Sequence, residues 1–432
     1  MSRPSLRLVV PEQTSRYMLT IDVTIVNVTE LHVGGSVIDK MTSAMADNVV
    51  SKIYAPVYRG PSASCDGYVY EIVPVIPSSS IKGVLRTFLE DHVRMSSRSI
   101  TLLEVLKKVI DVAERDLRDD EVAKDRVARD IVDRVLYRVL TQFLDESLAK
   151  HIYSIKSFSD LKAFIEAAAG TSIEGVAERL GLDRTGVGNY AAKVIVDTLK
   201  SFQLYKDVCY TVVEGLACEL PLPLYKLVLL RAISEALNEE IEYPCRVCKY
   251  LGLPGYASRI SITNAWPKNV DKAAILARTH IAIDRITGTV AQGKTFDVEY
   301  VAPGTEFEFF IVYRMHTKNL RTSLDEAKNR VKEFLDQDSQ SRSEDSLREI
   351  GLHDYDIEIL KVLKKFVNEL KNGGIQIGGR KTWSYGIVKL WNTFKVCLFD
   401  LAELRPPREP TPREGEPKPL WELRRVFGCE DC

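Results

Sequence analysis

The first clear pattern along the chain is an alternation of apolar and polar residues in YMLTIDVTIVNV, residues 17–28. Leu19, Ile21, Val23 and Ile25 fall on one side of an extended chain, because successive side chains of a strand point to opposite faces. The pattern therefore predicts a half-buried β-strand.

A segment without periodicity follows this strand. LHVGG ends in Gly34 and Gly35, where the backbone can turn sharply or approach a ligand closely because no side chain obstructs it. Residues 36–70 carry scattered Ser, Gly, Pro and Tyr with no repeating apolar spacing, which predicts a long loop. Such a loop inside a compact domain is unusual enough to indicate a function.

The segment IVPVIPSSSIKGVLRTFLEDHV changes character in its middle. An apolar extended run ends at Pro77, three serines follow as candidate helix N-caps, and Ile81, Val84 and Phe88 then recur at helical spacing. A strand or loop is therefore predicted to pass into a helix here.

From about residue 99 to residue 237 almost every window has helical spacing, as in LLEVLKKVIDVAERDL. Apolar residues recur at three and four positions, and charged residues fill the remaining ones. The pattern predicts a helical block whose charges are mostly a solvated face.

Short strands return after Cys248, in SRISITNAW, THIAIDRITGTV and KTFDVEYVAPGTEFEFFIVYRM. Two helices are predicted over residues 320–335 and 354–370, followed by a glycine-rich loop and a closing strand, YGIVKLWNTFKVCLF. The end of the chain is rich in Pro, Glu and Arg, which predicts an extended tail.

These elements together predict an α+β fold with a discontinuous core, because the N-terminal strand cannot form a sheet alone. We divide the chain into a first part of the core with the long loop, an all-helical insertion, a second part of the core, and the tail. The corresponding ranges are 1–95, 96–244, 245–400 and 401–432.

The composition limits how the chain can bind nucleic acid. Its 432 residues are 45% apolar, which is enough to bury a core without cross-links. The 59 basic and 60 acidic side chains nearly cancel, so nucleic-acid binding would need local patches. The sequence has neither an uncharged apolar run of about eighteen residues nor a signal peptide's apolar run, so we expect a cytoplasmic protein without a membrane partner.

The segment GGIQIGGRKTWSYGIVKL, residues 373–390, combines three features of a phosphate-binding loop. Its glycines leave backbone N–H groups free to face phosphate oxygens, Arg380 and Lys381 add charge, and Trp383 and Tyr385 offer ring faces for base stacking. The alternative is a tight turn against a sheet, and the segment lacks the Lys-Ser/Thr of a nucleotide-triphosphate loop.

Two further segments are candidates for RNA contact. SSSIKGVLR places hydroxyls and amides at the positive end of a helix, with Lys82 and Arg86 four apart on one face. IDRITGTVAQGKTF predicts a projecting hairpin that carries Arg285 and Lys294 and could wedge between bases. The alternatives are an ordinary capped helix and a simple surface hairpin.

Two C-x-x-C pairs, Cys245 with Cys248 and Cys429 with Cys432, have the spacing of half a tetrahedral zinc site. The partners that would complete a site around the first pair are all cysteines: Cys209 and Cys218 in one set, Cys429 and Cys432 in another. The alternative is a pair of buried thiols.

Five of these segments, in their order along the chain, resemble the motifs of the RAMP superfamily. They are LHVGG, IPSSSIKGVLR, CRVCKYLG with ASRISITNA, IDRITGTV with PGTEFEF, and GGRKTWSYGIVKL. More narrowly, they are similar to backbone subunits of type III CRISPR effector complexes, the Csm and Cmr assemblies. The resemblance covers roughly residues 17–95 and 245–395.

The resemblance implies a ferredoxin-like (RRM-like) core with an antiparallel sheet and a β-hairpin thumb. It also implies an RNA-binding structural subunit that holds guide RNA (crRNA), contacts the guide:target duplex and assembles with other RAMP-type subunits in antiviral defence. The residues that the family motifs assign to RNA are Gly34, Gly35, Ser78, Ser79, Ser80, Lys82, Arg86, Arg285, Lys294, Gly378, Gly379, Arg380 and Lys381.

Catalysis is implied only for backbone subunits that carry an aspartate in the loop between the first strand and the serine-lysine helix. The family's aspartate directly precedes a small residue and Pro-Val, and in KIYAPVYRG this place is taken by Tyr54. Because a tyrosine cannot replace a carboxylate that holds a metal at neutral pH, we expect a non-catalytic subunit. The enzyme alternative is a Mg-dependent endoribonuclease that uses Asp47 or, after it, Asp39.

A third interpretation is a helix-turn-helix DNA-binding regulator. VAERLGLDRTGVGNY places Gly181 at a turn, with Arg184, Thr185 and Asn189 as candidate base contacts. The flanking KSFSDLKAFIEAAAG is not notably basic, so this interpretation ranks third.

Overall fold

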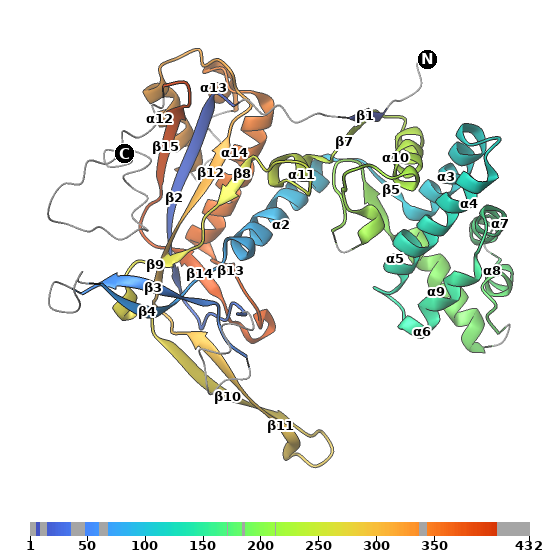
Figure 1. The fold of residues 1–432 in the computed structure, drawn as a ribbon, viewed down its shortest axis with the longest axis horizontal. Helices are drawn as coiled ribbons and strands as arrows, with labels where there is room; N and C mark the ends of the chain where they lie inside the picture. The colour runs from blue at the N-terminus through green and yellow to red at the C-terminus, as the bar shows by residue number, and fades with distance from the viewer. Residues whose placement is uncertain are drawn as a thin grey trace. The chain divides into compact units, whose positions relative to one another are not determined.

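The structure of the chain is a computed structural model that describes residues 6–8, 15–35, 48–59, 68–170, 172–183, 186–211, 213–336 and 344–403 (Figure 1). The chain forms two compact units, each built from segments far apart in sequence. The helical unit contains the described residues of 1–12 and 90–258, and the sheet unit those of 13–89 and 259–432. Among the described residues, no helix has an apolar stretch long enough to cross a membrane.

Helices make up most of the helical unit, as the sequence predicts. They are α3 (Leu102–Asp116), α4 (Glu121–Asp130), the π-helix η1 (Ile131–Tyr137), α5 (Arg138–Leu140), α6 (Glu146–Ala149), η2 (Lys150–Ser154), α7 (Phe158–Ala169), α8 (Ile173–Arg179), α9 (Gly186–Ser201), η3 (Glu214–Leu216), α10 (Leu224–Leu237) and α11 (Arg246–Leu251). Two short strand pairs were not predicted: β5 (Ser99–Thr101) with β6 (Gln203–Tyr205), and β1 (Leu6–Leu8) with β7 (Ile241–Tyr243).

The first long helix of this unit, α3, shows why the helical pattern succeeds. Thr101 accepts from the amide of Glu104, and the Glu104 carboxylate accepts from the amide of Thr101, which forms a capping box. Val105 and Val109 then fall on its fully buried face.

An antiparallel sheet forms the core of the sheet unit, and it confirms the predicted α+β class. The strand order is β13-β14-β2-β12-β8, and β15 and β9 pair with β2 and β12. These strands are β2 (Tyr17–Asn27), β8 (Ile260–Ile262), β9 (Trp266–Pro267), β12 (Glu306–Arg314), β13 (Ile375–Gln376), β14 (Ile387–Leu390) and β15 (Lys395–Asp400). Along the chain the core elements follow as strand, helix, two strands, helix and strand, an order that favours the ferredoxin-like interpretation.

The central strand, β2, differs from the prediction of a half-buried strand. Thr20 and Asp22, which point away from the predicted apolar side, are only 2% and 9% exposed. β2 pairs with β12 on one edge and with β14 and β15 on the other, so it lies in the middle of the sheet and side chains of neighbouring strands flank its own on each face. Central position can bury both faces of a strand, and sequence alternation does not show that position.

The α-helices described in this unit are α2 (Ser78–Ser96), whose residues from 90 onward are grouped with the helical unit, α12 (Leu324–Asp336), α13 (Glu344–Glu349) and α14 (Asp354–Asn372). The short 3-10 helices η4 (Val270–Lys272) and η5 (Lys381–Trp383) also lie here. The predicted helices at 320–335 and 354–370 are thus confirmed. The buried carboxylate of Asp356 fixes the start of α14, because it accepts from the hydroxyl of Tyr313 at 2.6 Å and from the amide of Thr317 at 2.8 Å.

The predicted long loop over residues 36–70 is wrong in its second half. β3 (Lys52–Tyr58) and β4 (Tyr68–Pro74) pair along their whole length as an antiparallel ribbon. Tyrosine and proline on one face, opposite apolar residues on the other, obscured the apolar-polar alternation from which a strand would be predicted, while cross-strand pairing still forms the ribbon.

The predicted projecting hairpin is present. β10 (Ile275–Ile283) and β11 (Val290–Val301) pair antiparallel, with a bulge between Ile281 and Ile283, and Figure 1 shows them extending away from the sheet. We call this element the hairpin.

Candidate functional site

A groove of about 490 Å³ lies in the sheet unit, between the beginning of α2 and the glycine-rich loop before β14. Three of the predicted RNA-binding motifs contribute to its lining. From these motifs the lining contains Gly34, Ser79, Ser80, Gly378, Gly379 and Lys381. We call this the glycine groove.

Two glycines of the groove are not explained by packing. Among the described residues, a Cβ added to Gly34 or to Gly83 would meet no atom within 4 Å beyond its chain neighbours and its own helix backbone, and neither residue has a positive φ. Gly83 also lies in the interior of α2, where glycine costs up to about 1 kcal/mol relative to alanine. The fold therefore does not require these glycines, while the space above them widens the groove.

The glycine-rich loop is held against the LHVGG segment by backbone contacts. The amide of Gly379 donates to the carbonyl oxygen of His32 at 2.8 Å, and Gly378 has a φ of +87°. A Cβ at Gly378 would overlap the His32 carbonyl group. In contrast to Gly34, Gly378 is needed by the fold itself.

The beginning of α2 differs in detail from the prediction. The three serines were expected to precede the helix as caps, but Ser78 is already helical, and its amide donates to Oδ1 of Asn264 at 2.9 Å. Because Asn264 caps the helix from a distant part of the chain, Ser79 and Ser80 face the groove instead. Sequence reasoning could not identify a cap that lies 186 residues away.

Lys82 and Arg86 lie one turn apart on α2, on the stripe next to the residues that line the groove. Burial and the neighbouring Arg86 guanidinium lower the pKa of Lys82. Because two cations held this close repel each other, an anion beside them would be stabilised.

The hairpin base and the glycine-rich loop meet through Arg380. Its guanidinium lies 5.2 Å from the ring centroid of Phe296 on β11, and Phe296 stacks on His280 of β10. Arg380 has a φ of +58°, so its backbone is in the left-handed region. The glycine-rich loop and the hairpin, two of the predicted motifs, are therefore in contact.

Tyr385 was expected to offer a stacking face, and this expectation is wrong. The residue is 6% exposed and lies 6.5 Å from Tyr300, ring to ring. Its hydroxyl accepts from Arg278 at 3.4 Å, and Arg278 also pairs with Glu30 at 3.0 Å. This cluster links the hairpin to the glycine-rich loop, and no local sequence signal predicts it, because its residues lie far apart in the chain.

His32 and Glu299 connect the other side of the hairpin base to the groove. Nδ1 of His32 lies 2.7 Å from the carbonyl oxygen of Glu299, so Nδ1 carries the proton, because a carbonyl only accepts. The Glu299 carboxylate pairs with Lys52 at 2.9 Å, and both side chains are almost fully buried. Sequence reasoning did not identify this pair, which joins residues 247 positions apart.

Several predicted residues do not line the groove. Arg285 and Lys294 are exposed on the outer half of the hairpin, and Gly35 is held beside the groove by its amide, which donates to Val49 at 2.8 Å. Asn189 is half-buried on α9. The remaining predicted positions lie outside the described residues: Asp39, Asp47, the side chain of Trp383, Arg184, Thr185, Cys429 and Cys432.

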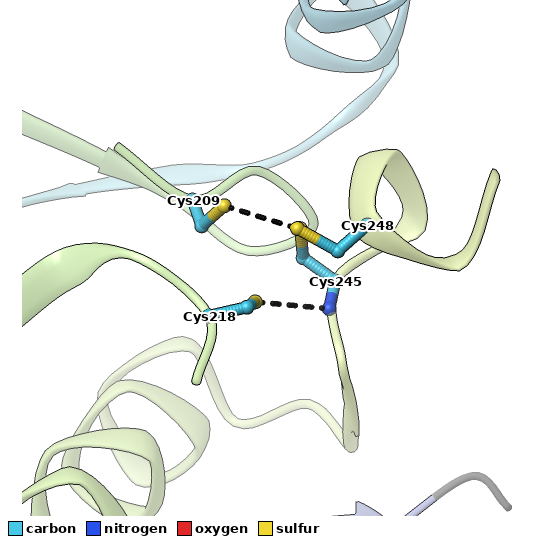
Figure 2. A group of neighbouring side chains, drawn as sticks. All are labelled: Cys209, Cys218, Cys245 and Cys248. Atoms are coloured by element: carbon cyan, nitrogen blue, oxygen red, sulfur yellow. Dashed lines mark hydrogen bonds between the residues drawn. The ribbon is translucent and has the colours of Figure 1, made fainter. Parts of the chain in front are cut away.

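A second site, in the helical unit, gathers four cysteines. Cys209, Cys218, Cys245 and Cys248 place their sulfur atoms within 4.8 Å of one another (Figure 2). The sulfur atoms of Cys209 and Cys248 are within hydrogen-bonding distance, 3.5 Å apart. Tetrahedral bonds of about 2.3 Å to one ion require sulfur separations of roughly 3.8 Å, so the cluster could hold a metal.

Two loops and one short helix bring these cysteines together. Cys209 and Cys218 flank η3, while Cys245 is the N-cap of α11 and Cys248 lies within it. The amide of Cys245 donates to the sulfur of Cys218 at 3.4 Å. The predicted pair and the first of its two predicted partner sets are thus adjacent in space.

The thiols strongly affect each other's protonation. Hydrogen bonds from the neighbouring thiols lower the pKa of Cys209. The hydrogen bond with Cys209 raises the pKa of Cys218 and of Cys245, and burial raises both further. Four thiolates this close can coexist only around a cation.

Comparison with known proteins identifies the family. The model of the RAMP superfamily matches residues 68–389. No curated protein matches the sequence. Among solved structures, that of the type III-B Cmr-beta complex bound to cognate target RNA contains a chain with a TM-score of 0.31 and 10% identity over 88% of this chain. This chain covers 61% of that one, about three fifths of its length. Because the family match spans most of the sequence, the chain belongs to the RAMP superfamily.

Proposed function

We propose that this protein is an RNA-binding structural subunit of a type III CRISPR ribonucleoprotein, which holds guide RNA and contacts the guide:target duplex. The observation that carries the proposal is the glycine groove. Three motifs far apart in sequence line one cavity, and two of its glycines, Gly34 and Gly83, have no packing reason to be glycine.

The groove has the chemistry of a phosphate-backbone site. Serine hydroxyls at the start of α2 and the loop beside Gly378 and Gly379 offer neutral donors, while Lys381, with Lys82 and Arg86 alongside, offers charge. Phosphate contacts of this kind fix the position of a nucleic acid without reading its sequence. That property suits a subunit that must accept guides of any sequence.

Other RAMP-type subunits and RNA are the partners that this function requires. The family membership supports both, and the similar solved chain comes from a complex that was determined with target RNA. We place the protein in antiviral defence on the same basis.

The salt dependence of RNA binding tests the proposal. Fluorescence anisotropy with a labelled single-stranded RNA should give a linear plot of log K against log salt, whose slope drops by about 0.7 units in Lys381→Ala, because one phosphate contact is lost. Lys193→Ala, at an exposed lysine on α9 in the helical unit, is the matched control and should keep the wild-type slope. Equal slopes for all three proteins, or no binding by the wild type, would refute the proposal.

We also infer that the four cysteines hold a structural zinc ion. Four sulfur ligands with no oxygen or nitrogen donor favour zinc over magnesium or calcium, and a closed set of four leaves no position for a substrate. The ion would tie the segment around η3 to α11, and so join two parts of the helical unit that are separated by α10.

A further inference from the structure

One face of the β3–β4 ribbon exposes aromatic side chains over its middle part. Tyr54 lies opposite Ile72, and Tyr70 lies opposite Pro56, so all four side chains share one face. Tyr54 is 59% exposed, Tyr70 71% and Ile72 40%. Large exposed apolar side chains grouped on one face indicate a binding surface.

The ribbon that carries these tyrosines is fixed from its other face. Ala55, Val57 and Val73 are buried there, and Trp266 packs against them. An ion pair at the end of β3 adds to this, because Arg59 bridges Glu71 at 2.7 Å and Asp271 at 2.5 Å. The tyrosines are therefore presented on a supported platform, which lowers the entropy lost on binding.

The two tyrosines are diagonal neighbours across the strands, with a Cα separation of about 7–8 Å. Stacked bases rise by about 3.4 Å per step, so a base stacked on each ring, or one base between the rings, fits this spacing. Every base has a π-face, and stacking on tyrosine therefore needs no particular sequence.

We propose that Tyr54 and Tyr70 form a stacking platform for unpaired bases of single-stranded RNA. The proposal rests on the function proposed above, because the platform is continuous with the glycine groove. Gly34, which lines the groove, is bridged to Val50, and the amide of Ser51 donates to the groove residue Val33 at 2.7 Å. From Val50 to Tyr54 the extended chain covers about 13 Å. An RNA strand of a few nucleotides can span this distance.

RNA fits this surface better than a protein partner does. Two tyrosines and one isoleucine can bury only a few hundred Å², whereas a specific protein interface needs about 800 Å² from each partner. Basic side chains together with exposed aromatic rings are the combination by which single-stranded nucleic acid is bound without sequence preference. Here Lys381 lines the groove, Lys82 and Arg86 lie beside it, and the chain that leaves it at Val50 leads along β3 to Tyr54.

A single-stranded RNA that contains 2-aminopurine flanked by uracils provides the test, because this base loses fluorescence when it stacks. We expect binding to the full chain to quench the probe, and Tyr54→Leu and Tyr70→Leu each to weaken binding about tenfold and reduce the quenching. The salt slope should stay at its wild-type value, because no phosphate contact is lost. Tyr54→Phe, which keeps the ring, should restore both affinity and quenching.

Tyr190→Leu is the matched control, since Tyr190 is an equally exposed tyrosine (67%) on α9. It should leave binding and quenching unchanged. If Lys381→Ala weakens binding but the leucine variants bind and quench like the wild type, the stacking platform is refuted while the groove function stands. If the leucine variants instead lose only a co-purifying protein subunit, the face is a protein interface and the proposal is likewise overturned. Absence of RNA binding by the wild type would refute both the stacking platform and the groove function.

Discussion

Gly378 lies directly against the carbonyl group of His32, so closely that a Cβ would overlap the oxygen. Its φ of +87° is also strained for any residue with a side chain. We expect Gly378→Ala to lower the free energy of unfolding by about 2 kcal/mol or more and to weaken RNA binding, because the loop must move away from His32. Urea unfolding and RNA anisotropy measure the two effects.

The same loop offers a control for this prediction. Among the described residues, a Cβ at Gly373 would meet no atom within 4 Å beyond its chain neighbours, and its φ of −94° suits any residue. Gly373→Ala should therefore change neither stability nor binding by a measurable amount. An equal loss in both variants would show that the loop tolerates no substitution at all, and the contact with His32 would lose its special role.

Gly83 should behave in the opposite way to Gly378. A Cβ there would meet no described atom outside its own helix within 4 Å, and replacing a glycine within α2 by a good helix former should raise the free energy of unfolding by up to about 1 kcal/mol. Because Gly83 lines the glycine groove, we expect Gly83→Leu to weaken RNA binding while the protein becomes more stable. Higher stability with unchanged affinity would show that the groove is not the RNA site.

The contrast between Gly378 and Gly83 shows which features of the site can be predicted from the sequence and which cannot. The glycine-rich loop, the serine-lysine helix and the cysteine pair could be found from composition and spacing, because each is local. The sequence could not show that Gly378 serves the fold and Gly83 does not, since this depends on His32, which is distant in the chain. Asn264 at the start of α2 and the Lys52–Glu299 pair escaped prediction for the same reason. The β3–β4 ribbon was missed because tyrosines on its open face broke the alternation.

The Lys52–Glu299 ion pair joins β3 to the hairpin base in a buried setting. Removal of one partner leaves an uncompensated buried charge, so Lys52→Met should lower the free energy of unfolding by about 3–5 kcal/mol. The double variant Lys52→Met/Glu299→Leu carries neither charge, so most of the lost free energy of unfolding should be recovered. A double-mutant cycle in urea measures this coupling.

A surface pair supplies the comparison. Arg348 and Glu344 are 3.3 Å apart with side chains 51% and 40% exposed, and Arg348→Ala should cost no more than about 0.5 kcal/mol. If Lys52→Met cost as little as this, the pair would not hold the hairpin.

Acid should weaken the contact between the groove and the hairpin through His32. Burial lowers the pKa of His32, with a smaller opposing contribution from its hydrogen bond to the Glu299 carbonyl and a further lowering by Arg380. The unfolded chain therefore binds the proton first as the pH falls. The stabilisation is complete above about pH 6.5 and is lost as the pH falls toward the lower folded-state pKa.

The measurement is the free energy of unfolding between pH 7.5 and pH 5. We expect the wild type to lose more stability over this range than His32→Gln, which has no group that titrates at this position. Parallel curves for wild type and His32→Gln would show that His32 does not contribute.

The four-cysteine cluster predicts one zinc ion per chain. Because structural metal sites are formed only on folding, the binding free energy contributes directly to stability. We expect Cys245→Ser to abolish stoichiometric zinc and to lower the free energy of unfolding of the helical unit by about 4 kcal/mol or more, or roughly 10 °C in Tm. A chelator added to the wild type should reproduce the shift.

Cys397→Ser is the matched control, since Cys397 is also buried (3%) but lies on β15, in the sheet unit. It should keep its zinc, and a loss of zinc from both variants, or from neither, would exclude this cluster as the site.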